Sequence, residues 1–209
     1  MTDAATARGL QADWHAVVSD WRGRSMKEIV GQVRPDFNMD EVLGTTLNEC
    51  LVKFALDGLD EAQRCTILRA WHELDAWPGF PQAMKQLHQS LPVVSLTMLP
   101  TALVVGVSRR NGLAWDVVIS CEMIDVYKPH AQAYETAARW LAPESPEILM
   151  VACHNFELKG AHNAGRRTAF VRRPAEWGPA GPPDPNPNTD YDVVVSDFGS
   201  LVQAVQSSR

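Results

Sequence analysis

The sequence predicts an α/β fold, with a Rossmann-like, mainly parallel sheet and an N-terminal helical cap. Residues 77–209 alternate short apolar runs with helical patterns, which is typical of a parallel sheet covered by helices on both faces. Residues 1–76, in contrast, hold three amphipathic helical patterns and no strand-like run. We therefore expect two domains, a helical cap over residues 1–76 and an α/β core over residues 77–209.

The first two cap helices are predicted by apolar spacing and by a capping residue. Apolar residues recur at helical spacing from Trp14 to Trp21, which gives a stripe on one helix face. Asn38 is suited to cap a second helix, because its side-chain oxygen accepts from the free amides of the first turn. We expect this helix to run through Phe54 and to end at Gly58.

The third cap helix is predicted by a capping box. Asp60 is followed three residues later by Gln63, so each side chain can bond the backbone amide of the other residue. The apolar stripe of this helix is expected to continue through Trp71 and Leu74.

The α/β part is predicted to contain five short strands separated by helices. Prolines at 81, 100 and 129 suit the first turns of three of these helices, and a glycine at 112 suits the end of one. A stretch rich in Pro, Gly and Asn, residues 172–190, is expected to be a surface loop. The predicted strands cover residues 91–96, 116–120, 148–152, 168–171 and 192–195.

The composition excludes several classes of protein. The 209 residues carry a net charge of −6, and no basic run typical of nucleic-acid binding is present. The four cysteines have no C-x-x-C spacing, which disfavours a zinc site or a disulfide framework and suits a reducing compartment. No apolar stretch approaches the length of a membrane span. We expect a soluble cytoplasmic protein without a nucleic-acid partner or a membrane partner.

Three polar residues are expected to meet at one edge of the sheet. Thr97 follows the first predicted strand, Lys128 precedes a predicted helix, and Glu157 follows the apolar run 148–152. The carboxyl ends of parallel strands converge on one crevice, which is where open α/β sheets bind ligands. A hydroxyl, an ammonium and a carboxylate would suit an anionic substrate and a covalent carboxylate intermediate.

The order of the motifs resembles the haloacid dehalogenase superfamily, and within it the type II 2-haloacid dehalogenases. The resemblance runs from about Asp13 to the C-terminus and implies that the helical first third is the cap domain of that family. The motifs are Leu96–Thr97, Tyr127–Lys128–Pro129 with Tyr134, residues 150–161, and residues 168–174.

The resemblance also implies roles for individual residues. Lys128 would keep a nucleophilic aspartate ionised, Thr97 would hydrogen-bond that aspartate, and Glu157 would hold the lysine and help to place water. The reaction implied is attack of the aspartate on the carbon that bears the halogen, followed by hydrolysis of the ester, without a metal. Substrate-binding roles would fall on Arg22, Tyr134, His154 and Asn155.

Departures from the family pattern change the expectation of activity. The family opens with an apolar strand that carries the nucleophilic aspartate, whereas Asp3 here follows no strand-like run. Met98 stands where an asparagine is usual, and Glu157 replaces an aspartate. We expect the first central strand to be missing and its neighbours to have unpaired backbone groups. The chain as given should therefore be marginally stable, re-register its sheet or pair with another chain, and it should be inactive or nearly so.

Three functional hypotheses stay open at this point. The first is a haloacid dehalogenase-like hydrolase that converts small 2-haloacids into 2-hydroxyacids. The second is a non-catalytic remnant or binding module, including one that associates with a second copy as a homodimer. A phosphatase of the same superfamily is less favoured, because it needs acidic residues that this sequence lacks. Cys153 is interpreted as a pocket wall, and Arg172 and Arg173 as solvated loop residues.

Overall fold

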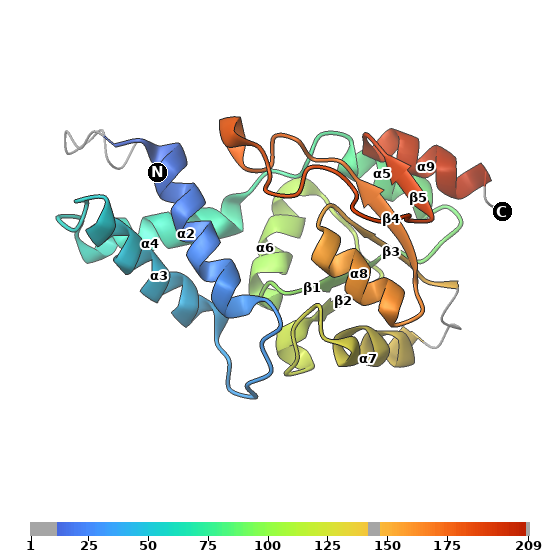
Figure 1. Ribbon diagram of the computed structural model, residues 1–209, viewed down its shortest axis with the longest axis horizontal. Coiled ribbons are helices and arrows are strands. Elements are labelled where there is room, and N and C mark those ends of the chain that lie inside the picture. The colour runs from blue at the N-terminus through green and yellow to red at the C-terminus, as the bar shows by residue number, and fades with distance from the viewer. Residues whose placement is uncertain (1–11, 142–146, 208–209) are drawn as a thin grey trace.

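The computed structural model describes residues 12–141 and 147–207, and it shows an all-helical N-terminal part followed by an α/β part (Figure 1). This arrangement confirms the predicted fold class. No helix among the described residues combines the length and the apolar character needed to cross a bilayer. The N-terminal elements are α2 (Trp14–Ile29), α3 (Met39–Lys53), α4 (Glu61–Arg69) and the 3₁₀ turn η1 (Ala70–Glu73).

Side-chain caps begin the helices of the N-terminal part. The Asn38 side chain accepts from the amides of Asp40 and Glu41 at the start of α3. Asp60 and Gln63 form the predicted capping box at the start of α4. These caps satisfy backbone donors that have no partner within their helix.

The ends of two cap helices differ from the prediction. Helix α3 ends at Lys53, before Gly58, because Ala55 adopts a left-handed conformation with φ of 55°. Helix α4 ends at Arg69, where the chain tightens into the 3₁₀ turn that contains Trp71. Leu74 lies beyond that turn and is 45% exposed, so it does not extend the apolar stripe.

The α/β part contains the five predicted strands, each within three residues of its expected bounds. They are β1 (Val94–Thr97), β2 (Val117–Ser120), β3 (Leu149–Ala152), β4 (Arg167–Val171) and β5 (Val193–Val195). The helices are α5 (Phe80–Leu87), α6 (Thr101–Asn111), α7 (Ala131–Leu141), α8 (Asn155–Asn163) and α9 (Phe198–Ser207), with 3₁₀ turns η2 (Cys121–Met123) and η4 (Gly178–Ala180).

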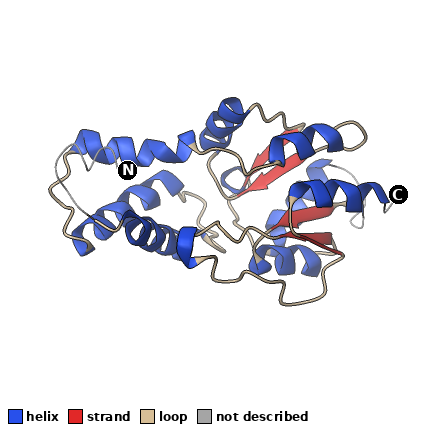
Figure 2. Ribbon diagram, turned by 90° about the horizontal axis from the view of Figure 1, so that it is seen from above, coloured by secondary structure: helices blue, strands red, loops and turns tan. Residues whose placement is uncertain are grey.

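The strands pair in parallel but form two sheets. Strand β1 pairs with β2, and β3, β4 and β5 form a second sheet (Figure 2). Within the described residues, β1 and β3 therefore each pair along one side only. The sheet predicted from the sequence is thus divided between β1 and β3.

Helices cover both faces of the second sheet. Phe170 of β4 packs with Leu158 of α8 on one face, whereas the neighbouring Val171 packs with Leu201 of α9 on the other. This alternation follows from the two-residue period of a strand. The prediction of helices on both faces is confirmed for this sheet.

Burial differs between the strands. Four of the five residues of β4 are buried, whereas no residue of β1 or β3 is fully buried. Strands β1 and β3 are the two whose carboxyl ends lead into Thr97 and Cys153. The half-exposed strands therefore end at Thr97, an expected catalytic residue, and just before Cys153, which was expected to line the pocket.

Candidate functional site

A buried ion pair joins the loop before α7 to the first turn of α8. The ammonium of Lys128 pairs with the carboxylate of Glu157 and donates a 2.9 Å hydrogen bond to the carbonyl oxygen of Leu96 in β1. Lys128 is 4% exposed and Glu157 is 8% exposed. Charges buried to this extent are tolerated only when they are paired and hydrogen-bonded. The structure therefore brings together two of the three residues expected to meet.

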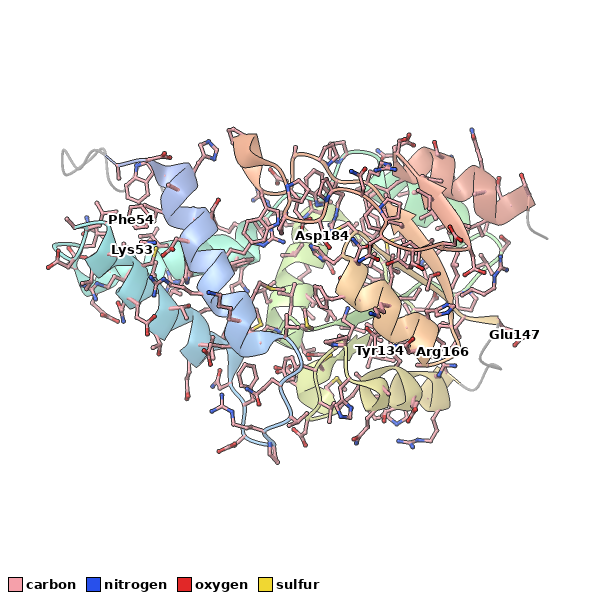
Figure 3. The ribbon with its side chains drawn as sticks, viewed as in Figure 1. Lys53, Phe54, Tyr134, Glu147, Arg166 and Asp184 are labelled. Atoms are coloured by element: carbon pink, nitrogen blue, oxygen red, sulfur yellow. The ribbon has the colours of Figure 1, made fainter. Side chains whose placement is uncertain are left out.

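A glycine allows α8 to approach this loop closely. A Cβ atom on Gly160 would lie 2.8 Å from the hydroxyl oxygen of Tyr134 and 2.9 Å from Pro129. The Tyr134 hydroxyl donates a 2.7 Å hydrogen bond to the backbone oxygen of Glu157 (Figure 3). The close approach of α7, α8 and the lysine loop thus fixes Glu157 beside Lys128.

His154 precedes α8 and links two carboxylates. Its Nδ1 lies 3.0 Å from Glu157 and its Nε2 lies 3.1 Å from Glu176. Burial alone would lower the pKa of His154, but hydrogen bonds with Cys153, Glu157 and Glu176 outweigh burial and raise the pKa to about 11. The imidazole is therefore positively charged at neutral pH.

Both carboxylates are ionised at neutral pH. Burial would raise the pKa of Glu157, but the charges and hydrogen bonds of Lys128 and His154 lower it to about 2. Burial also opposes ionisation of Glu176, yet His154, Arg173 and Arg22 hold its pKa well below the usual range. Nearby positive charges thus determine the ionisation of both groups.

Two arginines complete the network from opposite parts of the chain. Arg22, on α2, pairs with the Glu176 carboxylate and donates a 3.2 Å hydrogen bond to the Glu176 backbone oxygen. Its guanidinium carbon lies 4.3 Å from the ring centroid of Trp177. Arg173 contacts the Cys153 sulfur and lies 3.6 Å from Glu176. One continuous set of ion pairs therefore runs from the cap helix to the core.

This network carries an excess of positive charge. Three permanent cations and two carboxylates give it an excess of one positive charge, and protonated His154 adds a second, whereas the whole chain carries −6 with its histidines counted as neutral. A partly buried excess of cations favours the binding of anions. The members are Arg22, Lys128, His154, Arg173, Glu157 and Glu176.

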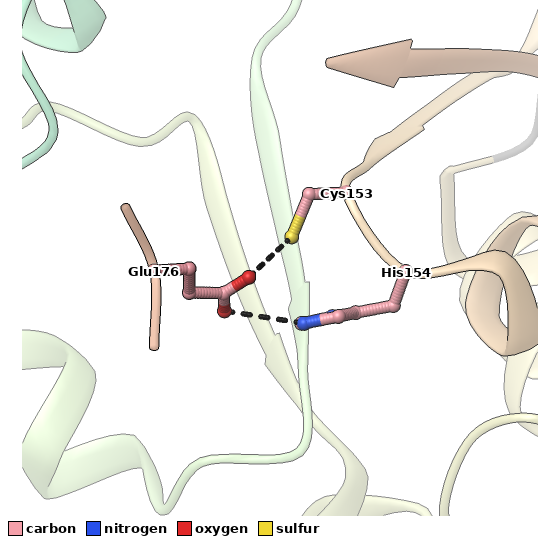
Figure 4. A group of neighbouring side chains, drawn as sticks. All are labelled: Cys153, His154 and Glu176. Carbon is pink, nitrogen blue, oxygen red and sulfur yellow. Dashed lines mark hydrogen bonds and ion pairs between the residues drawn. The ribbon is translucent and has the colours of Figure 1, made fainter. Parts of the chain in front are cut away.

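Three side chains of this region offer atoms that metals bind. The Cys153 sulfur, the His154 Nε2 and a Glu176 oxygen lie within 4.8 Å of one another (Figure 4). Such a donor set is typical of zinc sites. However, two guanidinium groups contact the same region, and a protonated imidazole has no free lone pair for a metal. The charges of these residues favour an anion over a cation.

Thr97 is held by its own turn. Its hydroxyl oxygen accepts a 3.0 Å hydrogen bond from the amide of Leu99, so the hydroxyl hydrogen stays available for donation. The Lys128 ammonium reaches β1 through the carbonyl oxygen of Leu96 rather than through Thr97. The catalytic role expected for Thr97 therefore stays a prediction.

The side chain of Asn155 forms hydrogen bonds with the loop that follows β4, not with the ion pairs. Its side-chain nitrogen donates to Asn186, and its side-chain oxygen accepts from Asn188 and Tyr191. Asp184, near the start of α8 in Figure 3, accepts from the Asn155 amide. These contacts engage the amide group of Asn155, and its expected substrate-binding role stays a prediction.

The sequence interpretation missed part of the network. Arg173 was expected to be solvated, but it contacts Cys153. Its place two residues after the predicted strand 168–171 was a signal, since residues at strand ends reach the crevice. Glu176 lies in a loop rich in proline and glycine, and no local pattern distinguishes it from a surface glutamate.

One cavity lies away from this network. It has a volume of about 880 Å³, lies between α2 and α3, and is lined mainly by polar and charged residues. Its charged side chains largely satisfy one another, since Arg24 pairs with both Asp20 and Glu49. We therefore place the candidate site at the buried network.

Comparison with known proteins assigns the chain and its fold to a family. No protein-family model matches the chain. Two curated (S)-2-haloacid dehalogenases, from Xanthobacter autotrophicus and Pseudomonas sp. (strain YL), are 28% and 26% identical to it over 116 and 118 residues. These alignments cover 54% and 55% of this chain, and the chain spans about half the length of the two proteins, 46% and 51%.

Solved structures match over nearly the whole chain. A defluorinating L-2-haloacid dehalogenase has a TM-score of 0.89 at 29% identity, covering 98% of this chain and 86% of that one. Another L-2-haloacid dehalogenase has a TM-score of 0.87 at 30% identity, covering 97% and 89%. The Xanthobacter autotrophicus enzyme with chloropropionic acid covalently bound has a TM-score of 0.82 at 22% identity, covering 98% and 91%, and supports the fold alone.

These matches define an α/β protein of the Rossmann-like class with a helical cap. The chain belongs to the haloacid dehalogenase superfamily, and it is similar to the L-2-haloacid dehalogenases of that superfamily. The resemblance inferred from the sequence motifs is confirmed.

Proposed function

We propose that the chain is a haloacid dehalogenase-like hydrolase whose buried network binds a small 2-halo carboxylate. The observation that carries this proposal is the excess of positive charge in a partly buried ion-pair network. A 2-haloacid supplies one full negative charge, and its carbon–halogen bond develops a second one as it breaks. The activity of the curated relatives, which are (S)-2-haloacid dehalogenases, supports the same substrate class.

The residues of the network suit distinct parts of this reaction. Arg22 and His154 are cationic donors for the substrate carboxylate or the departing halide. Lys128 is placed to hold an attacking carboxylate in its ionised form, and Glu157 fixes its ammonium. The free hydroxyl hydrogen of Thr97 is suited to donate to the same carboxylate. The proposed product is a 2-hydroxyacid, and the proposal requires neither metal nor cofactor.

The described residues do not supply a free nucleophile. Among them, the carboxylate that contacts Lys128 is that of Glu157, which is also bound by His154. A carboxylate held by two cations is a poor nucleophile, because its lone pairs are engaged. We therefore expect the described residues to bind the substrate without turning it over.

Binding and halide release measured side by side test this proposal. (S)-2-chloropropionate should bind saturably by calorimetry and should release no more chloride than the Lys128→Met variant does. Sustained chloride release above that control would refute the expected inactivity. No saturable binding would refute the site itself.

The open strand edges favour a second candidate, an association module. Strands β1 and β3 contain no fully buried residue and pair along one side within the described residues. Such edges are templates for strand pairing with another chain, here a second copy. Light scattering after size exclusion should show a dimer across a concentration series. A monomer at every concentration would exclude this candidate.

A further inference from the structure

The Glu176 carboxylate is the point on which the donors of the network converge. One oxygen is paired with Arg22, lies 3.1 Å from the Nε2 atom of His154, and lies 3.6 Å from Arg173. The other oxygen lies 3.1 Å from the Cys153 sulfur. The side chain is 8% exposed, so these groups take the place of water around it.

An external carboxylate would need the same hydrogen-bond donors that Glu176 uses. A carboxylate accepts through two oxygens, and Glu176 already engages two of the five N–H donors of Arg22 and the Nε2 donor of His154. A second carboxylate bound beside Glu176 would meet like charge in a water-poor site, which is unfavourable. An external carboxylate that uses Arg22 and His154 must therefore move Glu176 aside.

The loop that carries Glu176 has features that allow Glu176 to move aside. Residues 172–190 are rich in Pro, Gly and Asn, and their regular structure is limited to the short turn η4 among the described residues. Near Glu176, the loop is held to the cap through Arg22, which bonds the Glu176 backbone and stacks on Trp177. Farther along, Asn155 anchors the loop independently at Asn186 and Asn188. Residues near 176 can thus be released while the rest of the loop stays attached.

We propose that Glu176 is an internal carboxylate ligand of the anion site, which a substrate carboxylate must displace before it reaches Arg22 and His154. This inference rests on the proposed function, because it assumes that the external ligand of the network is a small carboxylate. Displacement moves Glu176 and Trp177 away from Arg22. The affinity for the substrate is then lowered by the free energy needed to break the internal contacts.

The first test compares carboxylate binding by two matched variants. Glu176→Gln keeps the shape of the side chain but removes its charge, and the exposed Glu135→Gln on α7 is the control. The probe is sodium propionate at constant ionic strength, because it has no halogen and cannot be turned over. Glu176→Gln should lower the Kd for propionate about tenfold, whereas Glu135→Gln should leave it unchanged.

The second test uses the unmodified chain and does not depend on the folding of a variant. Hydrogen exchange of the backbone amides of residues 172–178 is measured with and without saturating propionate. Displacement of Glu176 should make exchange in this segment faster when propionate is bound. Slower exchange would show that propionate strengthens the contacts of Glu176, and it would overturn the proposal.

The outcomes separate the inference from the proposed function. If the unmodified chain binds propionate and Glu176→Gln binds it equally or more weakly, then Glu176 positions the donors, and the displacement proposal is overturned. The proposed function would survive that result. If neither protein binds propionate or (S)-2-chloropropionate, both proposals fail.

Discussion

The two ends of the buried network are held in different ways. At the core end, Lys128 and Glu157 have side chains that are 5% and 10% exposed, and Gly160 packs their supporting elements together. At the loop end, Arg22 and Arg173 are 21% and 24% exposed, and they meet Glu176 in a segment with little regular structure. The core end is therefore a fixed part of the fold, whereas the loop end is adjustable. The following changes should make that difference measurable.

Removing the charge of Lys128 should have the largest effect on stability. The Lys128→Met variant leaves the buried Glu157 with His154 as its remaining charged partner, at a cost of about 3–5 kcal/mol in the free energy of unfolding. Urea denaturation measures this cost. As a control, the double variant Lys128→Met/Glu157→Leu should recover much of the loss. Equal stability of the single variant and the parent chain would show that the core end is not fixed by this pair.

Gly160→Ala should have the next largest effect on stability. The added methyl group would lie within 3 Å of Tyr134 and Pro129, so α8 must shift away from the lysine loop. Overpacking of this kind costs about 1–3 kcal/mol. The control is Gly44→Ala on α3, where a Cβ atom meets nothing within 4 Å. Similar midpoints of thermal unfolding for the two variants would contradict the close-packing account.

The pH dependence of the free energy of unfolding should reveal the protonation of His154. Its pKa is raised from 6.5 to about 11, so its contribution to stability is full below pH 6.5 and is lost as the pH rises towards 11. Glu157 acts in the opposite direction, because its contribution is lost as the pH falls from 4.5 towards 2. Between pH 7 and 9 the parent chain should lose up to about 1.4 kcal/mol per pH unit more than His154→Gln does. Parallel stability profiles would show that His154 is not protonated in the fold.

Arg22→Met should have the smallest effect on stability and a clear local effect. The side chain is partly exposed, so its loss should cost about 1 kcal/mol or less. The same change removes the contacts on Glu176 and Trp177, so chymotrypsin should cleave after Trp177 faster than in the parent chain. Unchanged cleavage would mean that Arg22 does not hold the loop.

The sequence predicted the parts of the site that regular elements carry. Lys128 and Glu157 flank strands and helices whose periodicity is plain, so their meeting followed from the topology of a parallel sheet. The caps at Asn38 and Asp60 were predicted for the same reason, since capping is a local interaction.

The sequence could not predict the loop end. Glu176 meets Arg22 across 154 positions of chain, through a loop whose path no local pattern determines. The hydrogen-bond partners of Asn155 could not be predicted for a related reason, because they lie about 30 residues away in the same loop. The division of the sheet between β1 and β3 was predicted in part. Unpaired strand edges were expected, but the pairing of the strands within each half was not.

Crystallographic location of a bound haloacid would test the central claim, that the network is an anion site, most directly. Crystals of the chain should be soaked with (S)-2-bromopropionate, and the bromine should be located by its anomalous scattering. The account predicts a bromine peak beside Lys128, with the carboxylate bound between Arg22 and His154 and Glu176 moved away. A network that stays closed around Glu176 at saturating ligand, with bromine bound elsewhere or not at all, would contradict it.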